Sequence, residues 1–293
     1  MYTHGTGTTD ALAQFTTTVS KALDNKGTYG VQCLLIDFSK AFDLMMPDTL
    51  AHKLSDMNVP PYIVRLVIDF LTNRQQCVKY QNSQSSTKPT RVGVPQGTIL
   101  GPVLWNVYVT DLGKNRQVVK YADDTTIIDT VLKANVTTTH KTGRERQITI
   151  TDNTIQSAAN EAVLWCENTS QRINASKQYM MLTLQINAAV SPSINIKGET
   201  VQQMKTAKLL GVTIDQHLTF SSHTKSVVDK TRSAVHGLLT LKRHGVSTAS
   251  LIKFYQARIT PILTYAAPSW YSYIPQYAAD QLERHQSLCL RLI

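Results

Sequence analysis

Apolar and polar positions along the chain change their period repeatedly, and each change predicts an element. Apolar residues spaced three or four positions apart predict amphipathic helices. Such stretches cover residues 9–24, 50–54, 60–71, 99–112, 155–165 and 221 onward. Short apolar or alternating runs that are bounded by turn residues predict strands. They cover residues 31–38, 74–80, 87–92, 118–121, 125–128, 178–186 and 207–215.

Three stretches are read differently. Residues 133–152 are polar and rich in threonine, and we expect a flexible insertion there. A boundary between two structural regions is expected near residues 215–221, where the last predicted strand gives way to basic helices. The final run, 280–293, has the pattern of an amphipathic helix without a C-terminal cap, so we expect the chain to be cut there rather than finished.

Acidic side chains stand at the ends of predicted strands. Asp37 is the first charged residue after the run that begins at residue 31, and Asp123 and Asp124 occupy the tip of a predicted hairpin. Successive strand side chains point to opposite faces, so only one of these two can be a full partner of Asp37. Carboxylates that share a site repel each other unless a cation lies between them. Two divalent ions in such a cluster are typical of phosphoryl or nucleotidyl transfer. The alternative interpretation of the Asp-Asp pair is an ordinary surface turn.

Composition narrows the classes of function. Hydrophobic residues make up 42% of the 293 residues, which is enough for a packed core. No apolar run reaches the roughly 18 to 20 residues that cross a bilayer, so no membrane partner is expected. The formal net charge of +10 favours a polyanion such as nucleic acid, with a merely solvated basic surface as the alternative.

The four cysteines are widely scattered along the chain. Their spacing fits neither a zinc site nor a disulfide framework. We therefore expect a reducing, intracellular compartment, and the sequence does not decide between nucleus and cytoplasm.

Several segments, in this order, resemble the motifs of the reverse transcriptase domain of non-LTR retrotransposons. The two acidic segments, 34–43 (LLIDFSKAFD) and 121–124 (YADD), are similar to its first and third catalytic motifs. The segment 93–102 (GVPQGTILGP), which lies between them, is similar to the second. Residues 174–177 (NASK) resemble the fourth motif, and 208–212 (KLLGV) the primer-gripping segment. The likeness covers nearly the whole chain.

The resemblance implies a role for particular residues. Asp37 and Asp123 would bind two Mg²⁺ ions, or Mn²⁺ in their place, with Asp124 assisting. Phe42 would lie under the sugar of the incoming nucleotide and exclude a 2′-hydroxyl, which argues for dNTPs. Lys177 would give a proton to the leaving pyrophosphate. The nucleotide and the template would contact Tyr121, Gln96 and Gly97. The primer end would contact Lys208, Leu209, Leu210 and Gly211. The implied partners are an RNA template, a DNA primer and the RNA–DNA duplex.

Each implied role has a plainer alternative. The alternative for Phe42 is an ordinary core residue, for Lys177 a solvated lysine, and for Gln96-Gly97 a simple loop before a helix. The family has a longer fingers segment before the first motif, which here follows only 36 residues, so we expect an element truncated at both ends. Two further hypotheses follow: a remnant that only binds RNA or RNA–DNA duplex, and a related enzyme that makes RNA or a cyclic nucleotide. Phe42 and the thumb-like C-terminus argue against the second.

The predicted fold class is α+β: a polymerase palm with an antiparallel sheet backed by helices, a partial fingers region and a helical thumb. The expected division is a fingers or connecting remnant over 1–30, a palm over 31–216 with a fingers-like insertion at about 45–95, and a thumb-like region over 217–293.

Overall fold

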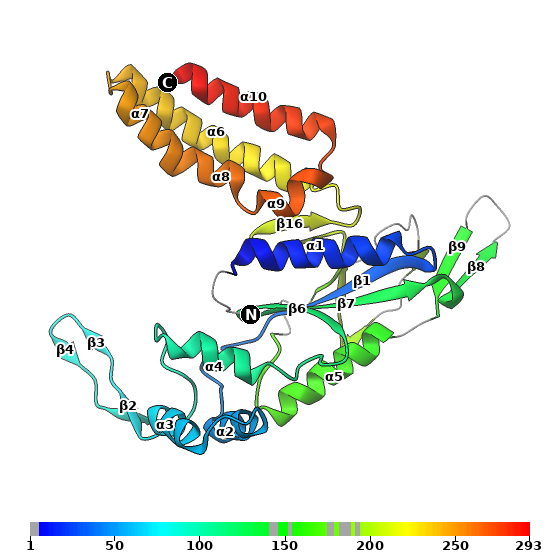
Figure 1. Ribbon diagram of the computed structural model, residues 1–293, viewed down its shortest axis with the longest axis vertical. Helices are drawn as coiled ribbons and strands as arrows, with labels where there is room; N and C mark the ends of the chain where they lie inside the picture. Colours follow the sequence, from blue (N-terminus) through cyan, green and yellow to red (C-terminus); the bar gives the residue numbers. More distant parts are fainter. Residues whose placement is uncertain (1–5, 141–145, 152–153, 175–178, 182–188, 191–193) are drawn as a thin grey trace.

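The computed structural model describes residues 6–140, 146–151, 154–174, 179–181, 189–190 and 194–293. A five-stranded sheet lies at the centre, with helices on both faces (Figure 1). The strands follow the order β14-β10-β1-β7-β6. Their bounds are Thr28–Ile36 for β1, Gln117–Tyr121 for β6, Asp124–Leu132 for β7, Tyr179–Met181 for β10 and Gln202–Met204 for β14. The predicted α+β class is therefore confirmed.

Neighbouring strands of this sheet are antiparallel, except at one edge. The pairs β1–β7, β6–β7 and β1–β10 run antiparallel, as predicted, whereas β10 and β14 are parallel. The central strand β1 is buried over nearly its whole length. This explains why its sequence is a nearly continuous apolar run rather than an alternating one.

The two faces of the sheet contribute to different hydrophobic cores. Val31 and Cys33 of β1 pack in one core with helix α1 (Thr8–Asp24) and with the strands that follow the sheet. Leu34 and Ile36 pack in the other core. That core includes α2 (Pro47–Asp56), α3 (Pro61–Leu71), α4 (Leu100–Tyr108) and α5 (Thr154–Asn168). The sheet therefore forms a layer between two sets of helices.

A thin double hairpin extends from the end of α3 (Figure 1). Its base is the antiparallel pair β2 (Arg74–Gln76) and β5 (Lys88–Thr90), and its tip is the pair β3 (Lys79–Tyr80) and β4 (Ser83–Gln84). The sequence predicted this hairpin, and the structure interrupts it between base and tip.

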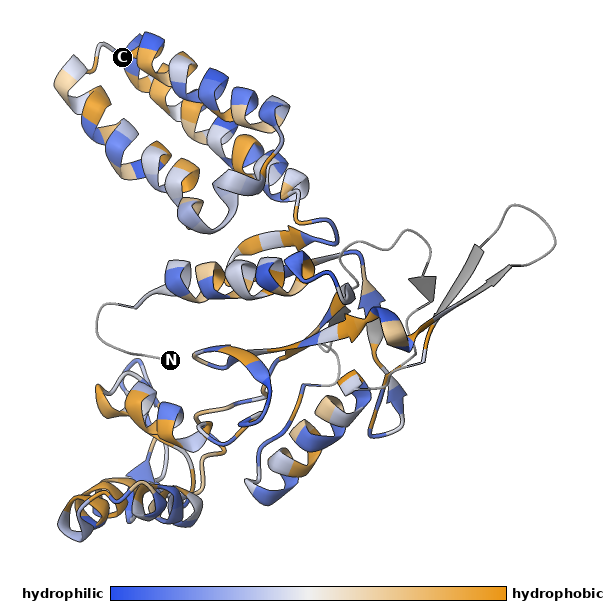
Figure 2. Ribbon diagram, turned by 45° about the vertical axis from the view of Figure 1, so that its right-hand side comes forward, coloured by the Kyte–Doolittle hydropathy of each residue, from blue (hydrophilic) through white to orange (hydrophobic). Residues whose placement is uncertain are grey.

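Helices form the C-terminal region, as predicted. They are α6 (Ser221–Arg243), α7 (Thr248–Phe254), a π-helical turn (Tyr255–Ile259), α8 (Thr260–Thr264), α9 (Ala267–Trp270), a 3₁₀ turn (Tyr271–Tyr273) and α10 (Gln276–Leu292). In Figure 2 these helices carry both hydrophobic and hydrophilic stripes. Their shared core contains Leu238, Leu251, Ile259 and Cys289. Within the described residues, no helix is long and apolar enough to cross a membrane.

Three expectations about local structure need correction. The polar region 133–152 contains a 3₁₀ turn (Lys133–Asn135) and two paired strands, β8 (Val136–His140) and β9 (Arg146–Ile150). Threonine is polar but β-branched, and it fits a strand well. Residues 207–215 form a hairpin rather than one strand, and the helix expected to reach residue 112 ends at Tyr108. Short strands β11 (Ala189–Val190), β12 (Asn195–Ile196) and β13 (Glu199–Thr200) complete the described elements. All four cysteines are free.

Lys120 on the edge strand β6 gives a pH-dependent contribution to stability. Its ammonium donates to the carbonyl oxygen of Val109 at 2.6 Å, and burial lowers its pKa from the ordinary 10.5 to about 8. Between pH 8 and 10.5 the unfolded chain therefore holds a proton on Lys120 that the native chain lacks, so this residue makes the free energy of unfolding rise with pH.

The corresponding test compares the wild-type chain with Lys120→Met by urea denaturation at pH 7, 8, 9 and 10. The difference in unfolding free energy between the two is expected to shift in favour of the wild type as the pH increases. Curves that stay parallel across this range would contradict the lowered pKa.

Candidate active site

The pairing of β1 with β7 brings two of the predicted acids to the same end of the sheet. Ile36, the last residue of β1, pairs with Thr125 of β7 in antiparallel register. Asp37 directly follows Ile36 and Asp124 directly precedes Thr125, so both acids lie at the same end of this strand pair. Both are half-buried, and both line one cavity of about 170 Å³. Lys208 and Leu209, which are far away in sequence, line the same cavity.

The turn between β6 and β7 holds the third acid. Tyr121 and Asp124 form the last pair of this hairpin, so Ala122 and Asp123 make the turn. Ala122 has φ of +54°, in the left-handed region that costs a non-glycine residue energy. The indole Nε1 of Trp105 donates to the carbonyl oxygen of Ala122 at 2.5 Å. Because Trp105 is fully buried in α4, it ties the turn to the helical layer below the sheet.

Asp37 is held by Asn174, the first residue of the predicted fourth motif. The backbone N–H of Asn174 donates to the carbonyl oxygen of Asp37 at 2.9 Å, and the Asn174 Nδ2 donates to the Asp37 Oδ2 at 3.1 Å. One residue further, Phe38 and Ile173 form an isolated antiparallel bridge. The backbone and the carboxylate of Asp37 are therefore both oriented by residues 173–174.

The second motif is bonded directly to the first. The N–H groups of Gly93 and Val94 donate to the carbonyl oxygens of Met45 and Phe42, at 2.8 and 2.9 Å. Gly93 has φ of +83°, and a Cβ there would lie 2.6 Å from the carbonyl oxygen of Asp43. Only glycine satisfies both conditions. The sequence motif thus corresponds to a close approach of two backbone segments.

Gln96 and Gly97 are exposed beyond that contact. The Gln96 Nε2 donates to the Asp43 Oδ1 at 3.1 Å, so the loop is linked to the end of the first motif. Gly97 has φ of +81°, and a Cβ on it would meet nothing within 4 Å. The backbone is therefore open to solvent at this position.

Phe42 lies between the core and the surface. Its half-buried ring is 5.5 Å from that of Trp105, centroid to centroid, in a tilted arrangement. Phe38 is 5.8 Å from the same indole, in edge contact. Trp105 therefore connects the segment that carries Phe42 with the turn that carries Asp123. This position is compatible with both interpretations of Phe42, as a nucleotide contact and as a core residue.

The predicted primer-gripping residues form a tight hairpin. β15 (Thr206–Leu209) and β16 (Val212–Asp215) are antiparallel, and Leu210 and Gly211 make the turn with φ of +46° and +87°. Two positive φ values identify the turn that suits the twist of a hairpin. The hydroxyl of Tyr265 donates to the carbonyl oxygen of Leu210 at 2.7 Å. A residue of the C-terminal region thus holds this turn.

Tyr121 pairs with Asp124 in the β6–β7 hairpin but does not line the cavity of Asp37 and Asp124. Tyr121 lines a different cavity of about 480 Å³, together with Lys114, Arg116 and Lys120. Lys177 lies outside the described residues, so the predicted proton donor stays a prediction.

The protein supplies only some of the oxygen ligands that a magnesium ion at the strand ends would need. Among the described residues, no group of three or more His, Cys, Asp and Glu side chains is arranged to hold a metal ion. Asp37 and Asp124 offer two carboxylates at one cavity. Mg²⁺ usually takes one or two protein carboxylates, with waters and substrate phosphates as the other ligands. Two carboxylates therefore fit an ion that the substrate helps to bind.

Two residues that matter for this geometry were missed as site residues by the sequence reasoning. Asn174 belongs to the predicted fourth motif, but the resemblance implied a role only for Lys177 in that motif. Trp105 lies in an apolar helix, and nothing local marks it, because its partner Ala122 is 17 positions away. A buried indole must find an acceptor, which is the only sequence signal that such a bond exists.

Fold and site together define a palm-type α+β protein, with acidic residues at one end of a central sheet. Residues 2–214 match the family described as reverse transcriptase (RNA-dependent DNA polymerase), and the chain belongs to that family.

Individual relatives are mobile-element proteins. The chain is 28% identical over 261 residues to the RNA-directed DNA polymerase from mobile element jockey of Drosophila melanogaster, covering 88% of this chain and 28% of the relative. It is 25% identical over 282 residues to the probable RNA-directed DNA polymerase from transposon BS of the same species, covering 92% and 29%. The chain thus spans less than a third of the length of these relatives.

Among solved structures, a telomerase from Candida tropicalis in complex with a telomeric RNA fragment aligns with a TM-score of 0.48 and 10% identity. The alignment covers 96% of this chain and 46% of that one. A likeness at this level carries no argument about function.

Proposed function

We propose that this chain is the core of an RNA-directed DNA polymerase, which adds deoxynucleotides to the 3′-hydroxyl of a primer along an RNA template. The observation that carries the proposal is the shared cavity of Asp37, Asp124, Lys208 and Leu209. It unites the acids of two strand ends with the segment predicted to hold the primer. Membership of the reverse transcriptase family and the names of the relatives support the same activity.

The proposed chemistry assigns work to residues from four parts of the chain. Two Mg²⁺ ions, when bound, would activate the attacking hydroxyl and neutralise charge on the leaving pyrophosphate. The sequence predicted Asp37 and Asp123 as the ligands, with Asp124 assisting. Because Asp124 rather than Asp123 lines the cavity of Asp37, we assign Asp37 and Asp124 to hold the ions, with Asp123 in the adjoining turn assisting. The β15–β16 turn would keep the primer end in line, and Lys177 would supply the proton. Positioning and charge neutralisation are the main contributions to such transfers.

The test of this proposal is primer extension with purified protein, a DNA primer on an RNA template, the four dNTPs and Mg²⁺. Extension that needs template, dNTPs and metal together is expected. A failure of the wild-type chain to extend, combined with salt-dependent binding of the same primer–template, would favour the second hypothesis of a protein that only binds RNA or RNA–DNA duplex. The net charge of +10 is the observation that keeps this second hypothesis open.

Phe42 provides a prediction about sugar selection. If its ring excludes the 2′-hydroxyl, Phe42→Ala should increase rNTP incorporation relative to dNTP about tenfold or more, because the space of the ring becomes available to the hydroxyl. Phe42→Tyr keeps the ring and should keep the preference. The measurement is the ratio of single-nucleotide incorporation rates for dNTP and rNTP.

Unchanged selection in Phe42→Ala, with activity retained, would assign Phe42 to the core instead. A wild-type chain that prefers rNTPs would instead revive the hypothesis of an RNA-making enzyme.

A further inference from the structure

The β15–β16 hairpin belongs to the candidate site but is not hydrogen-bonded into the central sheet. Among the described strands, β15 and β16 pair only with each other. By contrast, β1 and β7, which lead to Asp37 and Asp124, are both strands of the five-stranded sheet. Lys208 and Leu209 of β15 nevertheless line the cavity of these acids. Contacts other than the hydrogen bonds of the central sheet must therefore set the position of the hairpin relative to the acids.

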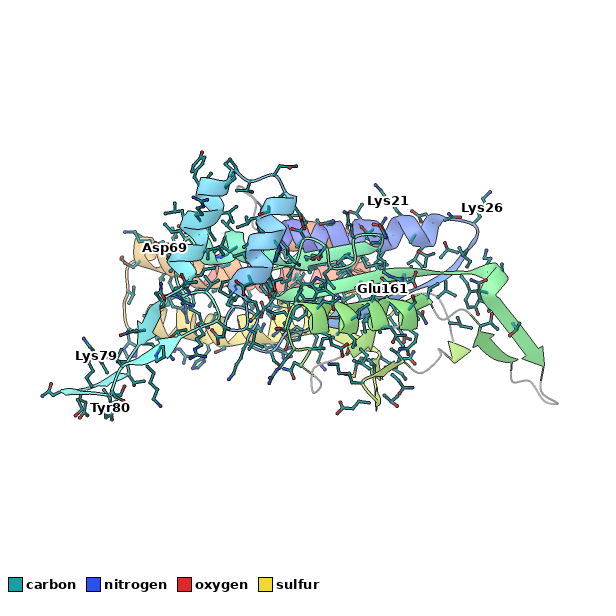
Figure 3. All side chains as sticks on the ribbon, turned by 90° about the horizontal axis from the view of Figure 1, so that it is seen from below. Lys21, Lys26, Asp69, Lys79, Tyr80 and Glu161 are labelled. Atoms are coloured by element: carbon teal, nitrogen blue, oxygen red, sulfur yellow. The ribbon has the colours of Figure 1, made fainter. Side chains whose placement is uncertain are left out.

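Apolar packing holds the strands of this hairpin against helix α1. Leu209 and Val212 are buried in the core that also contains Leu12 and Phe15 of α1. Lys21, near the other end of the same helix, points outward into solvent (Figure 3). Helix α1 is thus fixed by its apolar face, with a charged side chain on its outer face. It offers a rigid support for any group that is bonded to it.

Tyr265, which lies between α8 and α9, holds the turn of the hairpin. Its hydroxyl donates to the carbonyl oxygen of Leu210 at 2.7 Å. Its ring lies against Gly211, where an added Cβ would be 3.2 Å from the Tyr265 Cε1. The same hydroxyl lies 3.1 Å from that of Thr8, the first residue of α1. A phenol carries one proton, so when Leu210 accepts it, the Thr8 hydroxyl is the donor to the phenol oxygen. Tyr265 therefore joins the turn to the start of α1.

Tyr265 is itself fixed within the C-terminal region. The indole Nε1 of Trp270, which is fully buried, donates to the carbonyl oxygen of Tyr265 at 3.0 Å. The Trp270 ring is in edge contact with His223 of α6, with 5.0 Å between the ring centroids. The Nδ1 of His223 accepts the backbone N–H of Thr213 in β16, at 3.3 Å. In Figure 1, β16 lies between α1 and the C-terminal helices. These helices therefore hold the hairpin at two points, its turn and its second strand.

We propose that Tyr265 is a positioning residue for nucleotide addition, because its hydroxyl fixes the Leu210-Gly211 turn and thereby aligns the primer end with the acids. This inference rests on the proposed function, which assigns the primer end to the hairpin. Tyr265 does not line the cavity of the acids and acts through the turn. Lys208 and Leu209, which do line it, directly precede the Leu210 carbonyl that Tyr265 holds. A displacement of about 1 Å between reacting groups can reduce a rate about a hundredfold.

The test is single-nucleotide incorporation by rapid quench, with saturating dNTP and an excess of primer–template. Tyr265→Phe keeps the ring against Gly211 and removes only the hydroxyl. Its burst rate should be about ten- to a hundredfold lower than that of the wild type, whereas the burst amplitude and the Kd for primer–template should stay within about twofold. Tyr271→Phe is the matched control and should keep the wild-type rate, since Tyr271 is 45% exposed against 41% for Tyr265 and lies in the 3₁₀ turn after α9.

A second measurement does not depend on activity. Amide hydrogen exchange of the peptide that covers residues 206–215, followed by mass spectrometry, should be faster in Tyr265→Phe than in the wild type. The reason is that the turn has lost one of the bonds that oppose its local opening. Exchange in the buried strand β1 should be the same in both proteins. Unchanged exchange over 206–215 would overturn the inference.

The outcomes of the rate measurement separate this inference from the polymerase proposal. A wild-type burst rate in Tyr265→Phe, or an equal loss in Tyr271→Phe, would overturn the inference and leave the polymerase proposal intact. A lower burst amplitude at an unchanged rate would also overturn it, because that result reports less folded protein rather than a misaligned primer. A wild-type chain that extends no primer would overturn the polymerase proposal and this inference together.

Discussion

The Asp37→Asn protein is expected to extend an RNA-templated DNA primer at least about a thousandfold more slowly than the wild type, because each tenfold in rate corresponds to about 1.4 kcal/mol and metal-held charge supplies several kcal/mol. The substitution keeps the size of the side chain and removes its negative charge. Asn174, which donates to the Asp37 carboxylate, can still find an acceptor in the new amide. The loss would therefore reflect charge rather than a collapsed site.

Asp124→Asn should show a loss of similar order, since Asp124 lines the same cavity as Asp37. Asp69→Asn is the control, because Asp69 is an exposed acid on α3, outside the site. Single-nucleotide incorporation in a rapid-quench experiment gives the rates, and circular dichroism melting checks that all variants are folded. Extension by Asp37→Asn at the rate of Asp69→Asn would remove Asp37 from the active site.

Trp105→Ala is expected to lower the free energy of unfolding by about 3 to 5 kcal/mol, the usual result of deleting a large buried aromatic side chain. Trp105 is fully buried and is in ring contact with Phe38, Phe42 and Tyr108. Its removal leaves a cavity in the core below the sheet. It also takes away the N–H donor of the Ala122 carbonyl, in the turn between β6 and β7.

Urea denaturation of the wild type and of Trp105→Ala measures the difference in their free energies of unfolding. Leu164→Ala provides the control, because Leu164 is 58% exposed on α5 and its truncation should change stability by no more than about 0.5 kcal/mol. The stability loss of Trp105→Phe should lie between those of Leu164→Ala and Trp105→Ala, because phenylalanine keeps a ring but has no N–H donor. A loss below about 1 kcal/mol in Trp105→Ala would contradict the role of this residue in tying the turn to α4.

Much of the local structure is predictable because burial leaves a period in the sequence. The apolar spacing of α1 and the continuous run of β1 each follow from the surfaces that they cover. Asp37 is conspicuous for the same reason, as a charge at the end of a buried strand. The proximity of Asp37 to Asp124 follows from the pairing of β1 with β7. No local pattern in the sequence shows that these two strands pair.

The sequence-based prediction was wrong where polar residues form a strand, and it was incomplete where a contact joins residues that are distant in the sequence. The threonines of β8 were counted as loop residues, although they are β-branched. The turn at Leu210-Gly211 was missed because Leu210, with φ of +46°, is an unusual residue for that conformation. The placement of Lys208 at the cavity of Asp37 depends on the packing of a distant hairpin, and sequence spacing carries no information about it.

The most direct test of the central claim, that Asp37 and Asp124 form a metal centre, is a titration with Mn²⁺ followed by electron paramagnetic resonance. Mn²⁺ takes the same oxygen ligands as Mg²⁺ and is itself observable. With primer–template and a non-reacting dNTP analogue present, the wild type and Asp69→Asn are expected to bind Mn²⁺ alike. Asp37→Asn and Asp124→Asn should each bind it at least about tenfold more weakly, which is about 1.4 kcal/mol for one lost carboxylate. Wild-type affinity for Mn²⁺ in both of these variants would contradict the account.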